Sequence, residues 1–287
     1  MIPEPRHRYP EHVIHERQRV SESGSFRERV QYDLVARPSY AFGVLAAADI
    51  ARFFGYRKVT VIEFGVANGD GLLNLCNLTE QVSAVTNIEF RVLGFDNAIG
   101  LPEPVDYRDH PEIWSKGDFR MTNRPQLEQE IPPHARLLIG PVSETLPEAM
   151  RDISDDAPVG FVAHDMDIYS STVDCLKIYE SDARKLLPVS IAYFDDTLGA
   201  PGRIGTLLRN EWCGQLLAIN EFNRRGEYRK IDIIRTLPHR RPLSDELWLK
   251  QIYAIHALDH PLRNSSKRQA SYSLDEHQST MSLDWPY

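Results

Sequence analysis

Cysteine is scarce in this chain of 287 residues, which contains only Cys76, Cys175 and Cys213. The three lie far apart and form no Cys-x-x-Cys pair, which excludes a disulfide framework and a cysteine-based zinc or redox motif. Unpaired thiols persist in a reducing compartment. We therefore expect a cytoplasmic protein.

Long hydrophobic runs and an excess of positive charge are also missing. No apolar run approaches the roughly 20 residues needed to span a bilayer, and the first residues lack the apolar core of a signal peptide. Acidic residues outnumber basic ones, 41 to 33, for a formal net charge of −8. Because no general field draws such a chain to polyanions, we expect neither a membrane nor a nucleic acid as partner.

What remains is the composition of an ordinary globular protein, with 42% hydrophobic and 26% charged residues. A chain of this length can bury the core of a single α/β domain that carries extensions. Both ends are polar and lack the apolar periodicity of packed elements. We therefore predict an N-terminal arm over residues 1–30, a main domain over 31–262 and a C-terminal tail over 263–287. The two ends are candidates for contacts between copies of the chain in a homo-oligomer.

Short β-branched runs alternate with segments long enough to hold helices, which is typical of a parallel sheet. A helix over 40–54, ended by Gly55, precedes the first run. Parallel strands are predicted at 58–63, 90–96, 135–139, 159–165 and 189–195. Two final runs, at 230–235 and 251–258, leave little room for a crossover helix and should pair antiparallel. The pattern predicts a Rossmann-like, doubly wound α/β fold whose sheet is mostly parallel with a final antiparallel strand.

The first predicted strand ends at Glu63 and enters a loop that contains Gly65, Gly69 and Gly71. Glycine permits positive φ angles and lets a nucleotide-like ligand approach backbone N–H groups closely. The spacing differs from the Gly-x-Gly-x-x-Gly of dinucleotide-binding folds, which disfavours an NAD-dependent oxidoreductase. Asp96 ends the second strand, where a carboxylate can accept both hydroxyl protons of a ribose. The alternative is that the loop is an ordinary turn and Asp96 caps a helix.

Loop, acid and strand order together resemble the class I S-adenosylmethionine-dependent methyltransferases, over about residues 40–258. The resemblance implies S-adenosylmethionine as cofactor, with the glycine loop as the first motif and Asp96 as the second. The segment after the third strand, up to Ser143, is similar to the family's adenine-binding segment, although Ser143 could instead be a helix N-cap. The implied cofactor-binding residues are Glu63, Gly65, Val66, Ala67, Asn68, Gly69, Gly71, Asp96, Asn97 and Ser143.

Carboxylates gather after the fourth and fifth predicted strands: Asp165 and Asp167 follow one, and Asp195 and Asp196 follow the other. The carboxyl ends of parallel strands meet at one edge of the sheet, so these acids should converge. Like charges in one site raise each other's pKa, and a divalent cation relieves the repulsion. Oxygen ligands favour Mg²⁺, with Mn²⁺ and Ca²⁺ left open. The alternative is a set of helix caps and solvated acids.

The acidic pattern resembles the metal-dependent O-methyltransferases, namely catechol O-methyltransferase and the macrocin and mycinamicin sugar O-methyltransferases. The whole chain is also similar to an uncharacterised group of bacterial methyltransferase-like proteins. The resemblance implies that the metal binds a pair of substrate hydroxyls and lowers the pKa of one of them. The implied metal ligands are Asp165, Asp195 and Asp196.

One position departs from those relatives. Several of them have a lysine or histidine three residues after the strand-four acid, where this chain has Ile168. The candidates for the catalytic base are then His164 and Asp167, although His164 could equally be a packed strand residue.

These observations predict S-adenosylmethionine-dependent O-methylation of a small hydroxylated acceptor, a sugar or a phenolic compound. A Rossmann-like nucleotide-binding protein without catalysis is the alternative, and Ile168 is its best support. The insertion over 101–121 is either a lid or a packed excursion. The stretch 199–203, rich in glycine and proline, either closes over the metal or forms a plain turn.

Overall fold

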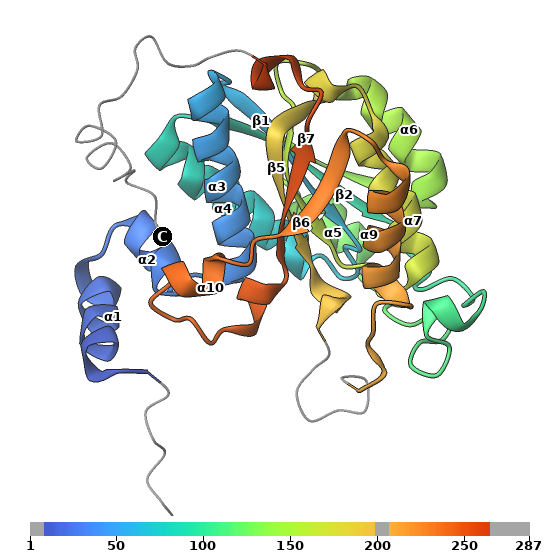
Figure 1. Ribbon diagram of the computed structural model, residues 1–287, viewed down its shortest axis with the longest axis horizontal. Coiled ribbons are helices and arrows are strands. Elements are labelled where there is room, and N and C mark those ends of the chain that lie inside the picture. Colours follow the sequence, from blue (N-terminus) through green and yellow to red (C-terminus); the bar gives the residue numbers. More distant parts are fainter. Residues whose placement is uncertain (1–8, 199–206, 265–287) are drawn as a thin grey trace, which may run out of the picture.

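The computed structural model describes residues 9–198 and 207–264. Its centre is a seven-stranded sheet in the order β3-β2-β1-β4-β5-β7-β6 (Figure 1). The stretch 199–203, residues 1–8 of the predicted arm and residues 265–287 of the predicted tail lie outside the described residues. The strands are β1 (Lys58–Phe64), β2 (Glu89–Asp96), β3 (Ala135–Ile139), β4 (Val159–His164), β5 (Leu186–Phe194), β6 (Arg229–Ile233) and β7 (Ile252–Ala257).

The sheet is parallel from β3 to β5 and antiparallel beyond. β1 pairs in parallel with β2 and β4, while β3 continues beside β2 and β5 beside β4. β7 lies between β5 and β6 and runs antiparallel to both. This arrangement confirms the predicted Rossmann-like, mostly parallel fold with its antiparallel edge.

Helices cover both faces of the sheet (Figure 1). In that view α3 and α4 lie on one side, and α6, α7 and α9 lie on the other. The α-helices are α1 (Glu11–Ser23), α2 (Phe26–Gln31), α3 (Pro38–Phe54), α4 (Asp70–Thr86), α5 (Arg124–Glu130), α6 (Val142–Asp152), α7 (Tyr169–Leu176), α9 (Gly214–Arg225) and α10 (Leu237–Arg240). Short 3-10 helices are η1 (Tyr107–Asp109), η2 (Lys177–Glu180), η3 (Ala183–Lys185), η4 (Asp195–Thr197), η5 (Leu247–Lys250) and η6 (Pro261–Arg263).

Each face of the sheet has its own hydrophobic core. Adjacent residues of β1 alternate between them, so that Val61 packs into the core that contains Phe161 and Ile62 into the core that contains Phe194. Burial on both faces explains why the parallel strands are continuous apolar runs in the sequence. No helix among the described residues combines the length and apolar character needed to cross a membrane.

The predicted arm is helical from Glu11 onward and is tied to the C-terminal half of the chain. Arg241 donates to Asp33 at 2.7 Å, and both side chains are almost fully buried. The pair lies beside Trp248, whose indole N–H also donates to Asp33 at 3.1 Å. A buried ion pair of this kind fixes where the segment that leads into α3 lies against the domain.

Candidate functional site

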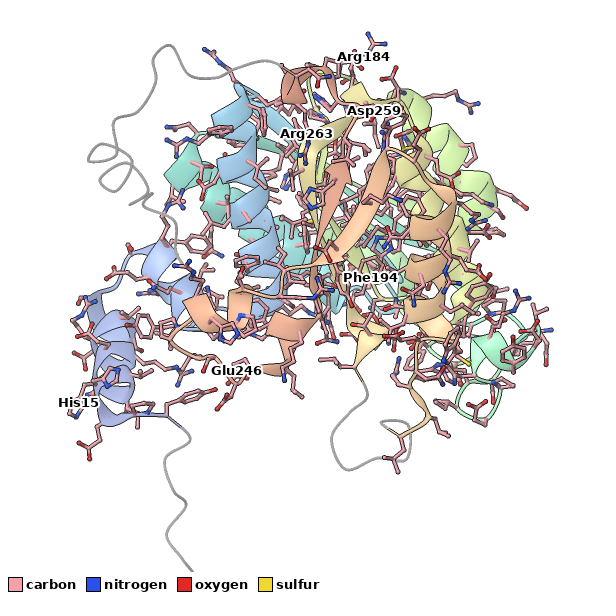
Figure 2. The ribbon with its side chains drawn as sticks, viewed as in Figure 1. His15, Arg184, Phe194, Glu246, Asp259 and Arg263 are labelled. Carbon is pink, nitrogen blue, oxygen red and sulfur yellow. The ribbon has the colours of Figure 1, made fainter. Side chains whose placement is uncertain are left out.

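A pocket of about 830 Å³ opens at the carboxyl ends of the parallel strands. Figure 2 shows Phe194, the last residue of β5, well separated from Arg184, Asp259 and Arg263 at the opposite end of the molecule. The pocket wall draws on the glycine loop, the end of β2, the segment after β3, the loops after β4 and β5, and the insertion between β2 and α5. Such a crevice is where open α/β sheets bind their ligands.

The glycines of the loop are required by backbone conformation and by close packing. Gly65 has φ +87°, and a β-carbon there would lie 1.7 Å from the carbonyl oxygen of Asp165. Gly69, with φ +95°, precedes α4, and a β-carbon on Gly71 would lie 1.9 Å from Oε1 of Glu63. Any larger residue at Gly65 or Gly71 therefore collides with the end of β4 or with Glu63.

Glu63 supports this loop from inside the domain and does not line the pocket. Its side chain is 1% exposed and accepts a hydrogen bond of 2.7 Å from the Tyr40 hydroxyl. Its other oxygen, Oε2, has no hydrogen-bond partner among the described residues. Burial raises the pKa of Glu63 to about 7, because the charged form loses its hydration.

Asp96 lies at the end of β2 and lines the pocket. Its Oδ2 accepts from the N–H of Ala67 at 2.8 Å, and its Oδ1 accepts from the N–H of Ala98 at 2.6 Å. Burial raises its pKa, and these backbone N–H groups oppose the rise. No helix begins at Asp96, so the helix-cap alternative is wrong. Each oxygen keeps a further lone pair that a ribose hydroxyl could use.

The other predicted cofactor-binding residues surround this centre. Val66 is buried, Ala67 lines the pocket, and the Asn68 side chain accepts from the N–H of Thr122 at 2.9 Å. Asn97 also lines the pocket and closes a tight turn, since its side-chain amide donates to the carbonyl of Gly100 at 2.8 Å.

The structure places Ser143 apart from the other predicted cofactor-binding residues. The pocket reaches Gly140, Pro141 and Val142, whereas Ser143 is an exposed residue outside its wall. α6 begins at Val142 with Pro141 as its N-cap, two residues earlier than a cap at Ser143 requires. The N-cap alternative is therefore wrong, and Val142 takes the place beside the pocket.

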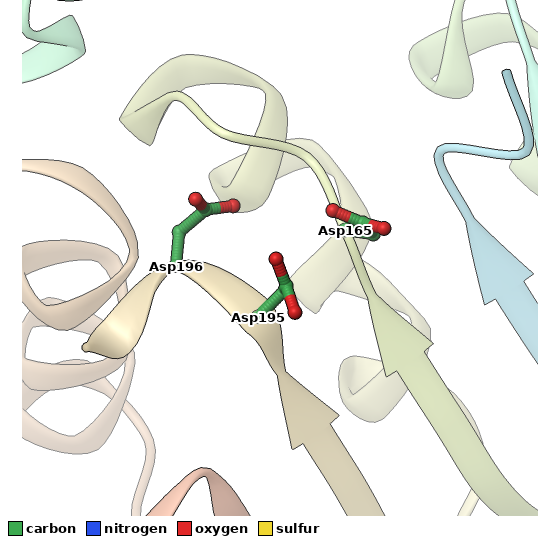
Figure 3. A group of neighbouring side chains, drawn as sticks. All are labelled: Asp165, Asp195 and Asp196. Atoms are coloured by element: carbon green, nitrogen blue, oxygen red, sulfur yellow. The ribbon is translucent and has the colours of Figure 1, made fainter. Parts of the chain in front are cut away.

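The acids after β4 and β5 converge (Figure 3). Asp165, Asp195 and Asp196 each offer a carboxylate oxygen, and these oxygens all lie within 4.8 Å of one another. Burial, and then the neighbouring carboxylates, raise the pKa of Asp165 well above its ordinary value. Burial also raises the pKa of Asp196, which is 6% exposed. None of the three caps a helix, since Ile168 and Phe194 hold those positions, and Asp196 is buried.

The charges around this cluster suit a divalent cation. Arg209 donates to Oδ1 of Asp196 at 2.9 Å and offsets one of the three carboxylates. Every donor of the cluster is a hard oxygen, the ligand type that Mg²⁺ and Ca²⁺ prefer. The Tyr193 hydroxyl donates to Asp195 and orients it. The residues present therefore fit a divalent metal ion.

Asp167 and His164, the two candidates for the base, occupy opposite environments. Asp167 lines the pocket in a left-handed conformation with φ +59°, and its N–H donates to Oδ2 of Asp196 at 2.9 Å. Burial, and then the neighbouring Asp196, raise the pKa of Asp167 to about 8. A carboxylate with this pKa accepts a proton readily near neutral pH.

His164 is fully buried in the core and does not line the pocket. Its ring stacks on Phe194 with centroids 4.4 Å apart, and its Nε2 is 2.8 Å from the Tyr179 hydroxyl. Burial lowers its pKa to about 3. The prediction of His164 as a base is wrong, because the alternation of β4 turns its side chain into the core while Asp165 faces the pocket edge.

Sequence reasoning missed several residues of the pocket. Arg209 and Gln251 line it, and Gln215 lies directly behind the acids. Gln215 and Gln251 lie in stretches that resemble the uncharacterised bacterial group, but that resemblance assigned them no role. The helical period of 214–225 could have singled out Gln215, since a polar residue on the buried face of a helix needs a buried partner.

The insertion between β2 and α5 forms a packed wall of the pocket. Asp109 is 1% exposed, and its Oδ1 accepts from the N–H of Ser170 at 2.7 Å in the first turn of α7. Arg108 lies over the ring of Tyr169, 4.8 Å from its centroid. Of the two alternatives for this insertion, these contacts favour the packed excursion.

Comparison with known proteins gives structural likeness alone. No family model and no curated protein matches the sequence. Similar solved structures include the calicheamicin methyltransferase CalS11, 18% identical over 76% of this chain and 86% of that chain, with a TM-score of 0.49. An O-methyltransferase from Bacillus cereus with SAH is 11% identical over 89% and 93%, with a TM-score of 0.38. A CmcI structure with Mg and SAM is 14% identical over 74% and 70%, with a TM-score of 0.37.

The chain has a Rossmann-like, doubly wound α/β fold whose sheet ends in the antiparallel β7. Identities and TM-scores at the levels above assign neither activity nor substrate. Chemistry must therefore be argued from the pocket itself.

Proposed function

We propose that this protein transfers a methyl group from S-adenosylmethionine to a hydroxyl group of a small acceptor, a sugar or a phenol, with the help of a divalent cation. One observation carries the proposal. A single pocket joins a glycine loop and ribose-type acid, Gly65 and Asp96, to the carboxylate cluster around Asp165. The first pair suits a nucleoside and the second a metal ion.

The glycine loop and Asp96 would hold the cofactor. The bare backbone of Gly65 and Ala67 allows a close approach, and the Asp96 carboxylate is positioned by the same loop to accept from ribose hydroxyls. Ile99 and Val142 supply apolar surface for a base. The cofactor itself brings the methyl group, bonded to a positively charged sulfur.

Asp165, Asp195 and Asp196 would hold the cation. When bound, a divalent ion lowers the pKa of a hydroxyl group that it contacts. Asp167, on the same wall, accepts the proton that the acceptor hydroxyl releases. The acceptor oxygen forms a bond to the methyl carbon while the carbon–sulfur bond breaks, and the cofactor leaves as neutral S-adenosylhomocysteine. The walls contribute by aligning oxygen, carbon and sulfur.

A second candidate function is nucleotide binding without catalysis. Ile168 is fully buried at the position where related enzymes carry a base, so no side chain at this position can accept the proton. Asp167, the residue before Ile168, lines the pocket and could accept the proton in its place. Its presence favours catalysis over nucleotide binding alone.

Calorimetric titration of the purified protein with S-adenosylmethionine and S-adenosylhomocysteine, with and without Mg²⁺, tests the proposal. We expect Asp96→Ala to lose cofactor binding and Asp195→Ala to lose direct Mg²⁺ binding. Asp174→Ala is the matched control, because Asp174 of α7 also lines the pocket but is paired with Lys177 at the start of η2. Absence of binding of both nucleosides to the wild-type protein would refute the cofactor assignment.

Turnover separates the two candidate functions. Incubation with S-adenosylmethionine, Mg²⁺ and a panel of neutral glycosides and catechols should form S-adenosylhomocysteine in the presence of an acceptor. Cofactor binding without methylation of any acceptor in the panel would favour the silent binding protein.

A further inference from the structure

The side-chain amide of Gln215 bridges the two strand ends that carry the acids. Its Nε2 donates to the carbonyl oxygen of His164 at 3.1 Å, and its Oε1 accepts from the N–H of Asp196 at 2.9 Å. The residue is 1% exposed. His164 precedes Asp165 directly, so one carboxamide holds the backbone on both sides of the carboxylate cluster.

The bridge occupies the point where β4 and β5 separate. His164 and Phe194 are the last residues paired between the two strands. A direct backbone hydrogen bond beyond them would bring the donor nitrogen and the acceptor oxygen to about 3 Å. The carboxamide inserts between the carbonyl of His164 and the N–H of Asp196 and satisfies both, so the strands part by a defined amount without leaving buried polar groups unpaired.

An amide side chain satisfies both of these groups. The carbonyl of His164 needs a donor and the N–H of Asp196 needs an acceptor, and the carboxamide of Gln215 offers one of each at a fixed separation. Gln215 stands in the first turn of α9, after Cys213 and Gly214, and this helix packs beside η4. Its place on a rigid helix gives the bridge a fixed length.

We propose that Gln215 is a positioning residue that sets the gap between Asp165 and Asp196 and thereby the size of the cation that the cluster accepts. This inference rests on the proposed metal-assisted function. Mg²⁺ demands short, near-octahedral oxygen contacts of about 2.1 Å, whereas Ca²⁺ accepts longer and more variable contacts of about 2.4 Å. A gap that Gln215 holds at a fixed width therefore favours Mg²⁺, the smaller ion. A gap without the Gln215 bridge favours Ca²⁺, the larger one.

Ser190 provides a matched control for a purely structural role. Its buried hydroxyl donates to the carbonyl of Val159 at 2.8 Å, and so it also ties β5 to β4, but at the far end of β4 from the acids. Ser190→Ala removes a buried bond between the same two strands and leaves the acidic ends untouched. Both variants should lose stability, but only the Gln215 variant should alter metal binding.

The experiment measures Mg²⁺ and Ca²⁺ affinities by calorimetry on the full-length protein, without cofactor or acceptor, and thermal unfolding of each variant. In Gln215→Met, which keeps the length and loses the amide, we expect Mg²⁺ affinity to fall about 10- to 100-fold. Ca²⁺ affinity should fall less, so that the preference shifts toward Ca²⁺. Ser190→Ala should keep both affinities within about twofold, a change far smaller than the loss of an outer support residue.

The outcomes separate this inference from the proposed function. A wild-type protein that binds neither ion refutes the metal site and the inference with it. A wild-type protein that binds Mg²⁺, together with a folded Gln215→Met of unchanged affinity and ion preference, refutes the role of Gln215 alone. If Gln215→Met does not fold, Gln215→Asn decides in its place, because its amide is one methylene too short to reach both partners and should shift the preference in the same direction.

Discussion

The carbonyl oxygen of Asp165 lies so close to Gly65 that a β-carbon added to this glycine would be only 1.7 Å from that oxygen. The contact joins the end of β4 to the glycine loop after β1, so the glycine-loop side and the carboxylate side of the pocket share one backbone junction. The N–H of Asp165 also donates to the carbonyl of Phe64 at 3.0 Å. A change at Gly65 must therefore disturb both sides together.

Gly65→Ala is expected to destabilise the fold by at least about 3 kcal/mol, because strain from positive φ adds to a backbone collision. Gly55→Ala is the control, since Gly55 has φ +88° but nothing within 4 Å of a β-carbon. It should cost only about 1 kcal/mol. Urea unfolding of both variants measures the difference, and equal losses would contradict the close contact.

Glu63→Gln should change how stability depends on pH. The folded pKa of about 7 lies above the ordinary value of 4.5, so the stabilisation is full below about pH 4.5 and is lost as pH rises through 7. The loss amounts to about 3 kcal/mol at most, and it should be absent in the variant. Urea unfolding at pH 5 and pH 8 tests this. The exposed Glu89 provides a control, Glu89→Gln, which should keep the wild-type slope.

His164 should produce the opposite slope. Its folded pKa of about 3 lies below the ordinary value of 6.5, so the stability that depends on the neutral ring is present above about pH 6.5 and is lost as pH falls toward 3. Between pH 7 and pH 5 the wild-type protein should lose about 2 kcal/mol through this group. His164→Phe should lose less, whereas a variant at the exposed His15, His15→Asn, should behave as wild type.

Asp167→Asn should lower kcat for methyl transfer about 10²- to 10⁴-fold, because the amide cannot accept the proton. Asparagine tolerates the left-handed conformation, and the backbone N–H still donates to Asp196. Cofactor affinity should therefore stay near that of the wild type. Asp174→Asn should retain activity, since Asp174 lies on α7 and pairs with Lys177. Full activity in Asp167→Asn would remove Asp167 from the mechanism.

Asp109→Ala should loosen the wall formed by the insertion. The variant loses the bonds to the N–H groups of Ser170 and Val105, at 2.7 and 2.8 Å. We expect a loss of about 1–3 kcal/mol and faster proteolysis between residues 101 and 121. Asp106→Ala is the control, because Asp106 bonds only locally to Arg108. Resistance to proteolysis equal to that of the wild type would contradict the anchoring role of Asp109.

Local sequence determined most of the strands because each is short, β-branched and buried on both faces. The prediction for 135–139 coincides with β3, and the other parallel strands differ by a few residues at their ends. The largest shift is in β5, which begins at Leu186 and includes Pro188, where the apolar pattern suggested a start at Val189. Neighbouring strands, and not the local pattern, decide such boundaries.

The convergence of Asp165 with Asp195 and Asp196 followed from the sequence alone, since the carboxyl ends of adjacent parallel strands must meet. The identity of the base did not follow. His164 and Asp167 are three positions apart in the sequence. The side chain of His164, the last residue of β4, faces the core, whereas Asp167, beyond the strand, lines the pocket, and only the structure shows which faces which side.

The sequence by itself determined the parallel α/β class, the glycine loop and the edge at which the acids gather, because these depend on periodicity and on strand ends. Only the tertiary structure decided that Arg209 balances Asp196, that Gln215 spaces the two strand ends, and that Asp109 anchors the wall. These contacts join residues far apart in the chain, and no local pattern records which distant partner a buried polar group will meet.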